Sequence, residues 1–316
     1  PADQRHIAGF VVNKFRGDQR LLAPGLEMLE SMTGRPTLGV LPWRADLWLD
    51  AEDSLDLDSR PRAALPPHGS ASLRIAVVRL PRMSNVTDID PLAAEPGVVV
   101  DLATTPAQLE GADLVILPGT RATVSDLGWL REAGLAAAVT DRAARGLPVL
   151  GICGGYQMLA RSIHDDVESR AGTVPGLGLL PAAVTFTAAK TLTRPSGVAL
   201  GEAVDGYEIH HGTVSSSGGE PFLDGCRVGA VWGTTWHGIF ENDGFRRAFL
   251  RDLASRRGRD FTPAPGVSFA AVRERRYDVL ADMIGAHLDT DALGALIEGG
   301  VPAGLPTLTR GLAPSR

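Results

Sequence analysis

The chain has 316 residues, of which 44% are hydrophobic, 22% charged and 5% aromatic. This composition is typical of soluble globular proteins and excludes the disordered, collagen-like and coiled-coil classes. Its 31 Lys and Arg against 37 Asp and Glu give a net charge of −6 without a strongly basic run, which argues against nucleic acid as a partner. The length predicts about two folded units.

The cysteine content indicates the compartment. Cys153 and Cys226 are too few for a disulfide framework and do not form a C-x-x-C metal pair, so we expect a reducing, cytoplasmic compartment. The most apolar stretches, 112–117 and 147–153, are far shorter than the roughly 20 residues of a membrane span, and we expect no membrane partner. Because the chain begins with Pro1 rather than Met, we expect that the start of the natural protein is missing.

The first 58 residues have the pattern of a parallel sheet. Apolar runs at 7–12 and 37–41 predict strands, and the apolar spacing between Leu21 and Met32 predicts the helix that joins them. A strand, a helix and a second strand form the βαβ unit of a parallel sheet. Residues 59–72 are rich in Pro, Gly and small side chains, so we assign 1–58 to one domain and 59–72 to a linker.

Alternating α/β elements resume after the linker. We expect strands at 73–80, 98–101, 113–117 and 147–152, helices over 123–145 and from about 154, further strands at 182–187, 198–204, 207–209 and 228–232, and helices at 246–257 and 267–288. We assign 73–257 to a second domain. Residues 258–316 are expected to form a helical C-terminal extension with a loose tail.

The sharpest chemical signal surrounds Cys153. An apolar strand leads directly into Gly151-Ile152-Cys153-Gly154-Gly155 and then into a predicted helix. Small residues on both sides of a nucleophile permit the strained turn that exposes it at the carboxyl edge of a sheet. The start of a helix also favours the thiolate over the thiol. We therefore predict that Cys153 is a nucleophile rather than a buried space-filling residue.

A thiolate nucleophile needs a base, and His237 is the first candidate. It lies in a strand-like segment, Trp232 to Phe240, far enough along the chain to return to the elbow in space. His210 and His211 are alternatives, and either could be a structural histidine or a substrate contact. Spacing alone does not decide between the three.

A third element, Leu117-Pro118-Gly119-Thr120, ends another apolar strand in a glycine turn. If this turn lies beside the nucleophile strand, its backbone N–H groups and that of Gly154 can form an oxyanion hole. The alternative is a plain turn at the end of a strand.

These motifs together resemble a known family. Residues 73–250 resemble the class I glutamine amidotransferase domain, in the branch of the cobyric acid and cobyrinic acid diamide synthases. The matching segments are Leu117–Thr120, Gly151–Leu159, Gly206–His210 and Gly233–Phe240. Four further segments resemble the cobyric acid synthases in particular: Gly9–Asp18, Gly39–Trp43, Glu52–Leu55 and Ser84–Asp88.

The resemblance implies both the fold and the reaction. The fold would be a glutamine amidotransferase-like α/β sheet with flanking helices, preceded by the C-terminal fragment of a dethiobiotin synthetase-like parallel α/β domain. Glutamine would be hydrolysed, and its ammonia would amidate peripheral carboxylates of the corrinoid adenosylcobyrinic acid a,c-diamide to give cobyric acid.

The resemblance also implies the roles of individual residues. Cys153 would form a thioester with glutamine and His237 would manage the protons. Gly119 and Gly154 would offer oxyanion donors, and Gln157 would help to hold the glutamine.

Two departures from the family pattern matter. Many class I glutaminases carry a Glu two positions after the catalytic His, where this chain has Ile239; Glu241 is one candidate to orient His237 instead. The sequence also contains no G-x-x-x-x-G-K-[ST] phosphate loop. We therefore expect no cofactor and no metal in this chain, and we expect ATP and Mg²⁺ in a missing N-terminal part that belongs to the synthetase domain.

Alternative functions remain open. The chain could belong to a cobyrinic acid a,c-diamide synthase, which amidates other carboxylates of the same macrocycle. It could also be another amidase or hydrolase with a cysteine elbow, or an inactive glutaminase-like scaffold.

Overall fold

The computed structural model describes residues 3–44, 47 and 65–308. The chain divides into two compact units, Pro1–Trp48 with Arg273–Arg316 and Leu49–Val272. In the described residues, no helix is long and apolar enough to cross a membrane.

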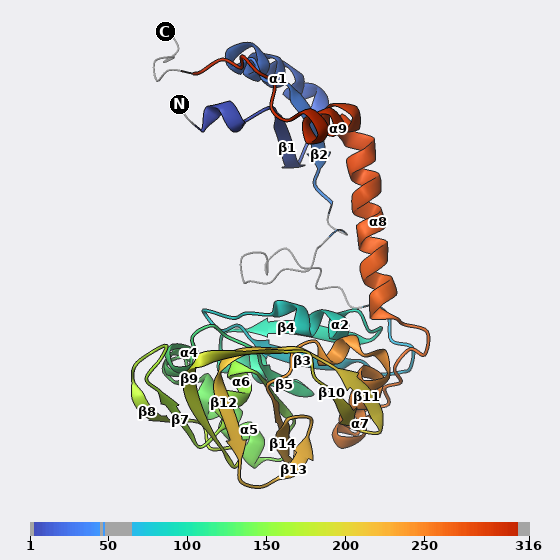
Figure 1. Cartoon of the computed structure of the whole chain (residues 1–316). Helices are drawn as coiled ribbons and strands as arrows, with labels where there is room; N and C mark the ends of the chain where they lie inside the picture. The colour runs from blue at the N-terminus through green and yellow to red at the C-terminus, as the bar shows by residue number, and fades with distance from the viewer. Residues whose placement is uncertain (1–2, 45–46, 48–64, 309–316) are drawn as a thin grey trace. The chain divides into compact units, whose positions relative to one another are not determined.

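The larger unit is built on a seven-stranded sheet (Figure 1). Its strand order is β13-β14-β15-β6-β5-β3-β4. The strands are β3 (Leu73–Val78), β4 (Val98–Ala103), β5 (Leu114–Leu117), β6 (Val149–Ile152), β13 (Glu220–Phe222), β14 (Gly225–Val228) and β15 (Val231–Thr234). The five strands from β15 to β4 are parallel, and β14 and β13 add antiparallel pairs at one edge. The mixed α/β fold with a parallel sheet is therefore as expected.

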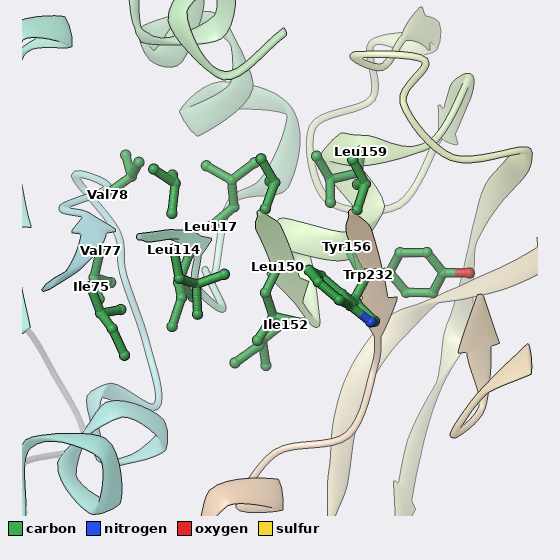
Figure 2. Packing of buried hydrophobic residues seen from close by; sticks show 14 of the residues in the cluster. Ile75, Val77, Val78, Leu114, Leu117, Leu150, Ile152, Tyr156, Leu159 and Trp232 are labelled. Atoms are coloured by element: carbon green, nitrogen blue, oxygen red, sulfur yellow. The ribbon is translucent and has the colours of Figure 1, made fainter. Parts of the chain in front are cut away.

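The apolar runs of the sequence form the core of this sheet. All four residues of β5, of β6 and of β15 are buried, as expected for parallel strands that are covered on both faces. Figure 2 shows the side chains of Leu114, Leu150 and Trp232 in this packing. The carboxyl ends of the parallel strands therefore lie at the edge of a sheet that is packed on both faces.

Six helices accompany this sheet along the chain. They are α2 (Asp90–Ala93), α3 (Pro106–Leu109), α4 (Thr123–Glu132), α5 (Leu135–Ala144), α6 (Gly154–Leu159) and α7 (Asp243–Arg257). The single helix expected over 123–145 was wrong, because the chain breaks at Gly134, whose φ of 73° is left-handed. Glycine adopts that conformation without the penalty that other residues incur.

A second sheet of four strands supplies another wall of the larger unit. Its order is β12-β9-β7-β8, from β7 (Ser162–Asp165), β8 (Gly172–Pro175), β9 (Ala182–Thr193) and β12 (Glu208–Ser216). The pairing of β9 with β12 is interrupted between His210 and Gly212. The hairpin β10 (Ser196–Ala199) and β11 (Glu202–Asp205) lies between them in sequence.

The smaller unit combines both ends of the chain. It contains the parallel pair β1 (Phe10–Phe15) and β2 (Thr37–Pro42), with α1 (Gln19–Thr33), most of α8 (Phe269–His287) and α9 (Thr290–Gly299). Gly39 forms a β-bridge with Leu288, and the N–H of Asp289 donates to the carbonyl of Leu38 at 2.7 Å. The part of the expected C-terminal extension from Arg273 onward thus groups with the N-terminal segment, whereas residues 258–272 belong to the larger unit. The likeness of this unit to a dethiobiotin synthetase stays a prediction.

The expected linker falls only partly on described residues. Residues 59–64 lie outside them, as do 1–2, 45–46 and 48–58 of the first domain. The described part contacts the larger unit, since the carbonyl of Leu65 accepts from the N–H of Gly97 at 2.8 Å and Ala71 donates to Asp260 at 3.0 Å.

Candidate active site

Cys153 forms the sharp turn between β6 and α6. Its backbone has φ 50° and ψ −111°, a left-handed conformation that costs a non-glycine residue about 1–3 kcal/mol. Glycines make the turn possible: a Cβ on Gly155 would lie 1.9 Å from the carbonyl oxygen of Leu117, and one on Gly154 would lie 2.7 Å from Thr120. The side chain of Cys153 is 5% exposed and lines a cleft.

His237 follows β15, the neighbour of β6, and forms a buried pair with Asp88. The Nδ1 atom of His237 lies 2.6 Å from a carboxylate oxygen of Asp88, and the other carboxylate oxygen accepts from the N–H of Gly238 at 2.7 Å. His237 is 1% exposed and Asp88 3%. Because a carboxylate only accepts hydrogen bonds, Nδ1 must donate, which leaves Nε2 as the ring nitrogen free for chemistry.

The surroundings of His237 decide its charge. Burial alone would lower the pKa of His237, but the negative charges of Asp88 and Cys153, and hydrogen bonds to both side chains, raise this pKa well above its usual value. A negative charge beside the ring therefore favours the protonated, imidazolium form of His237.

Tyr207 and Asn85 fix the plane of this imidazole. The Tyr207 ring stacks on the His237 ring with centroids 5.2 Å apart, and the two residues exchange backbone hydrogen bonds of 2.8 and 3.1 Å. The amide of Asn85 donates to the Tyr207 hydroxyl at 2.7 Å. His237 is thus held at one ring nitrogen, at one face and along its backbone.

Sequence reasoning missed the role of Asp88. It offered Glu241 as the group that orients His237, whereas Asp88 supplies the carboxylate at Nδ1. Asp88 belongs to 3₁₀ helix Val86–Ile89 in the connection that follows β3. The position of this connection after a parallel strand was the available signal, because the carboxyl ends of parallel strands meet at one edge of the sheet.

The predicted site residues meet around one cleft of about 660 Å³, which Cys153, Gln157, His237, Thr120, Thr123 and His210 help to line. Gly119 lies at its wall, where an added Cβ would come within 2.9 Å of the His237 ring. The Gln157 carbonyl accepts from Thr123 at 2.9 Å and its amide donates to the carbonyl of Gly212 at 3.3 Å. Arg121, Lys190 and Glu168 bring charges of both signs to the same cleft.

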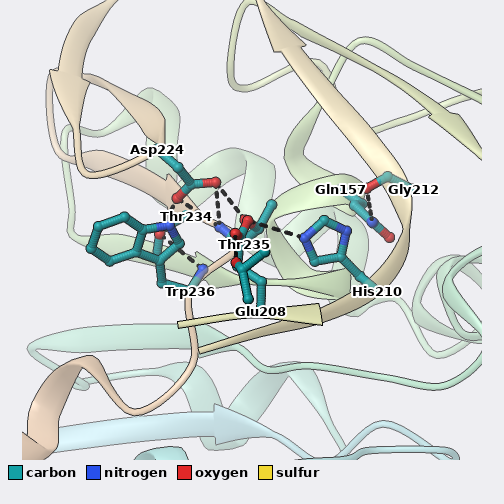
Figure 3. Close-up of polar contacts among 9 residues, drawn as sticks. Gln157, Glu208, His210, Gly212, Asp224, Thr234, Thr235 and Trp236 are labelled. Atoms are coloured by element: carbon teal, nitrogen blue, oxygen red, sulfur yellow. Dashed lines mark hydrogen bonds and ion pairs between the residues drawn. The ribbon is translucent and has the colours of Figure 1, made fainter. Parts of the chain in front are cut away.

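His210, the alternative base, lies in this cleft but bonds to a different carboxylate (Figure 3). Its Nε2 lies 3.3 Å from Glu208, and the Thr235 hydroxyl lies 2.8 Å from the same carboxylate oxygen. Burial would raise the pKa of Glu208, but hydrogen bonds from Thr193, Thr235 and His210 outweigh it, and the pKa is lowered.

Asp224 extends this network on its far side. Its carboxylate contacts the hydroxyls of Thr234 and Thr235, each at 2.5 Å, and the backbone N–H of Thr235 at 3.1 Å (Figure 3). Burial raises the pKa of Asp224 despite these hydrogen bonds, and the nearby charge of Glu208 adds to the rise. The Thr235 hydroxyl carries a single hydrogen, so it can donate to only one of these two carboxylates at a time.

The chain is similar to known glutamine amidotransferase domains and to cobyric acid synthases. Residues 74–245 match the family of CobB/CobQ-like glutamine amidotransferase domains. A cobyric acid synthase of Streptomyces avermitilis is 60% identical over 98% of this chain and 62% of its own length. One of Streptomyces coelicolor is also 60% identical, over 98% of this chain and 63% of its own length. The chain thus spans a little under two thirds of these relatives.

One solved structure is similar over part of the chain. A crystal structure described as a glutamine amidotransferase has a TM-score of 0.45 and 23% sequence identity to this chain. The similarity covers 58% of this chain and 98% of that one.

Proposed function

Because the chain belongs to the CobB/CobQ-like glutamine amidotransferase family, we propose that it hydrolyses glutamine at Cys153 and provides the ammonia for amidating a corrinoid. One observation carries the proposal: the cysteine on a strained elbow shares its cleft with a histidine that is paired to a buried aspartate. This is the arrangement that nucleophilic attack on an amide requires.

The chemistry follows from the positions of these groups. The Cys153 thiolate attacks the side-chain amide carbon of glutamine, and the oxygen becomes an oxyanion. The His237 imidazolium gives its proton to the departing nitrogen, so that ammonia leaves and a thioester remains. Water, deprotonated by His237, then attacks the thioester, which releases glutamate and restores the thiolate.

Three further residues contribute to the proposed reaction: Gly119, Gly154 and Gln157. Backbone N–H groups in the segments of Gly119 and Gly154 stabilise the oxyanion, because they lie in the two turns that border the nucleophile. Gln157 supports the glutamine subsite; Thr123 and Gly212 hold its amide.

The proposed identity of the acceptor is based on the names of the relatives. Since they are named cobyric acid synthases, we propose adenosylcobyrinic acid a,c-diamide as the corrinoid and cobyric acid as the product. We assign ATP, Mg²⁺ and the synthetase chemistry to the part of these relatives that this chain does not match. The lack of a G-x-x-x-x-G-K-[ST] loop supports this division of labour.

The test is glutamate release from glutamine by the purified chain, with and without an added synthetase domain, ATP and corrinoid. Cys153→Ala should abolish release, whereas Cys226→Ala is the matched control because this second buried cysteine lies in β14, outside the elbow. A diazoketone analogue of glutamine should add one mass equivalent to the wild type and none to Cys153→Ala. Release that survives in Cys153→Ala, or no release under any condition, would overturn the proposal.

A further inference from the structure

One ring nitrogen of His210 has no hydrogen-bond partner among the residues that the structure describes. This nitrogen, Nδ1, is buried, and the side chain is 8% exposed. The residue nevertheless lines the cleft that contains Cys153 and His237. Buried polar atoms without partners are uncommon in folded proteins, and a ligand that is absent from the structure is one explanation.

Glu208 determines which hydrogen-bonding role Nδ1 can play. The pKa of Glu208 is lowered, so its carboxylate is ionised at neutral pH and can only accept. His210 Nε2 must therefore carry the hydrogen that it donates to Glu208 at 3.3 Å. In the neutral ring, Nδ1 then carries a lone pair and can only accept a hydrogen bond.

The network behind Glu208 keeps this lone pair in place. Glu208 is bonded to Thr193 on β9 and to Thr235 after β15, and Thr235 in turn contacts Asp224. A flip of the His210 ring would sacrifice its bond to Glu208. In Figure 3 the ring meets Glu208 at one edge, and its opposite edge is on the side of Gln157.

Cys153, Gln157 and His210 line the same cleft of about 660 Å³. Cys153 precedes the first residue of α6 and Gln157 lies inside this helix. The Gln157 amide bonds the carbonyl of Gly212, two residues from His210. A glutamine with its side-chain amide at Cys153 and its α-carbon end at His210 would thus lie within one cleft.

We propose that the Nδ1 of His210 accepts a hydrogen bond from the α-ammonium group of glutamine bound in this cleft. This inference rests on the proposed glutaminase function and names the residue that reads the amino end of the substrate. The side-chain amide of glutamine is occupied at Cys153. Of the two remaining groups, the α-carboxylate only accepts hydrogen bonds and the α-ammonium only donates them. Only the ammonium complements a lone pair.

Direct binding in a chain that cannot turn over tests this contact. In the Cys153→Ala background, we would measure by calorimetry the Kd of glutamine and of 5-amino-5-oxopentanoate, which lacks the α-ammonium. His210→Phe should weaken glutamine about ten- to a hundredfold and leave the deaminated analogue nearly unchanged, since only glutamine loses a hydrogen bond from a charged group. His210→Asn, whose side-chain oxygen can replace Nδ1, should restore part of the loss.

The control is His211→Phe, which changes the adjacent cleft residue, whose Nδ1 lies 3.3 Å from the carbonyl of Thr187. Its effect should be the same on both ligands. Equal weakening of both ligands by His210→Phe would show a structural role and overturn the inference. The inference would also be overturned if His210→Phe weakened glutamine but left the binding of 4-aminobutanamide unchanged. This analogue lacks the α-carboxylate, so that result would mean that His210 contacts the carboxylate. Failure of Cys153→Ala to bind glutamine at all would overturn the glutaminase proposal itself.

Discussion

Asp88 and His237 are 149 positions apart in the sequence, yet their buried side chains form a pair beside the cleft. Asp88 raises the pKa of His237, against the effect of burial. The carboxylate thus serves two purposes: it fixes the tautomer and it favours the charged form of the imidazole beside the sulfur. The two purposes can be separated by substitution with asparagine.

Asp88→Asn should lower the kcat of glutamate release about a hundredfold or more, with a smaller change in KM. It removes a negative charge, so the pKa of His237 falls, and the alkaline limb of the kcat profile should move to lower pH. The measurement is glutamate release between about pH 6 and 10. Asp166→Asn, at an exposed aspartate that pairs with His164, is the control. An unchanged alkaline limb would contradict the assigned role.

The sequence was sufficient to propose a nucleophile, Cys153, but not to predict the residues that surround it. Cys153 and Gln157 lie in one contiguous motif whose glycines have a geometric reason to be there. Asp88 carries no local pattern of that kind, because its partner is 149 positions away. His210 was left open for the same reason, since its carboxylate partner becomes decisive only once Thr193 and Thr235 lie around it.

At the scale of single elements, the elbow depends on close approach between α6 and β5. Gly155→Ala would place a Cβ 1.9 Å from the carbonyl oxygen of Leu117, which neither backbone can avoid without moving. We expect a destabilisation of about 1–3 kcal/mol and a large loss of glutamate release, because α6 carries Gln157 and its start sets the position of Cys153. Thermal unfolding and kinetics on the same preparation measure both effects.

Gly128→Ala is the matched substitution for that experiment. Gly128 lies inside α4 with open space around its Cβ position, so alanine should be neutral or stabilise the chain by up to about 1 kcal/mol. Equal effects of the two substitutions would refute the steric explanation of the elbow.

A buried ion pair connects the segment that follows Asp88 with the segment that follows His237. Arg246 on α7 donates to Glu95 at 3.1 Å and to the carbonyl of Phe240 at 3.0 Å, and both charged side chains are fully buried. Glu95 follows Asp88 on the chain, and Phe240 follows His237. Arg246 therefore holds together the segment that carries Asp88 and the segment that carries His237.

Arg246→Gln should cost about 3–5 kcal/mol of unfolding free energy, because it leaves Glu95 buried without a counter-charge. The double variant Glu95→Gln/Arg246→Gln should be less destabilised than the sum of the two single variants. Arg256→Gln, which breaks a partly exposed pair with Asp252 on the same helix, should change stability by less than about 1 kcal/mol. Urea denaturation of the four variants measures these changes in unfolding free energy. If the effects of Glu95→Gln and Arg246→Gln added exactly in the double variant, the two side chains would not be energetically coupled.

Across the whole molecule, the alternation of apolar strands and helices was enough to predict a parallel α/β sheet. Runs such as Leu114–Leu117 are short, wholly apolar and bounded by turns, and this pattern indicates a strand buried on both faces. The grouping of the C-terminal segment with the N-terminal one was beyond such patterns. It depends on single contacts such as Gly39 with Leu288, which have no periodic signature.

The smaller unit leaves large apolar side chains uncovered. Leu21 is 83% exposed, Met28 60% and Ile297 85%, around a sheet of only two strands. We expect concentration-dependent self-association of the isolated chain, since such surfaces bury themselves where they can. Sedimentation velocity should show Leu21→Gln with Met28→Gln to be more monomeric than the wild type. Val198→Gln, at a residue 71% exposed in the larger unit, should have no such effect; a chain that is monomeric at every concentration would contradict the expectation.

The division of the smaller unit between the two ends of the chain also sets an order of events during synthesis. Ribosomes add about 5–20 residues per second, so about one to three seconds pass between the synthesis of Val272 and that of Leu288. The unit of Leu49–Val272 can complete its core in that interval, whereas the bridge between Gly39 and Leu288 must wait. The nascent chain therefore carries a folded larger unit before Gly39 has its final neighbour.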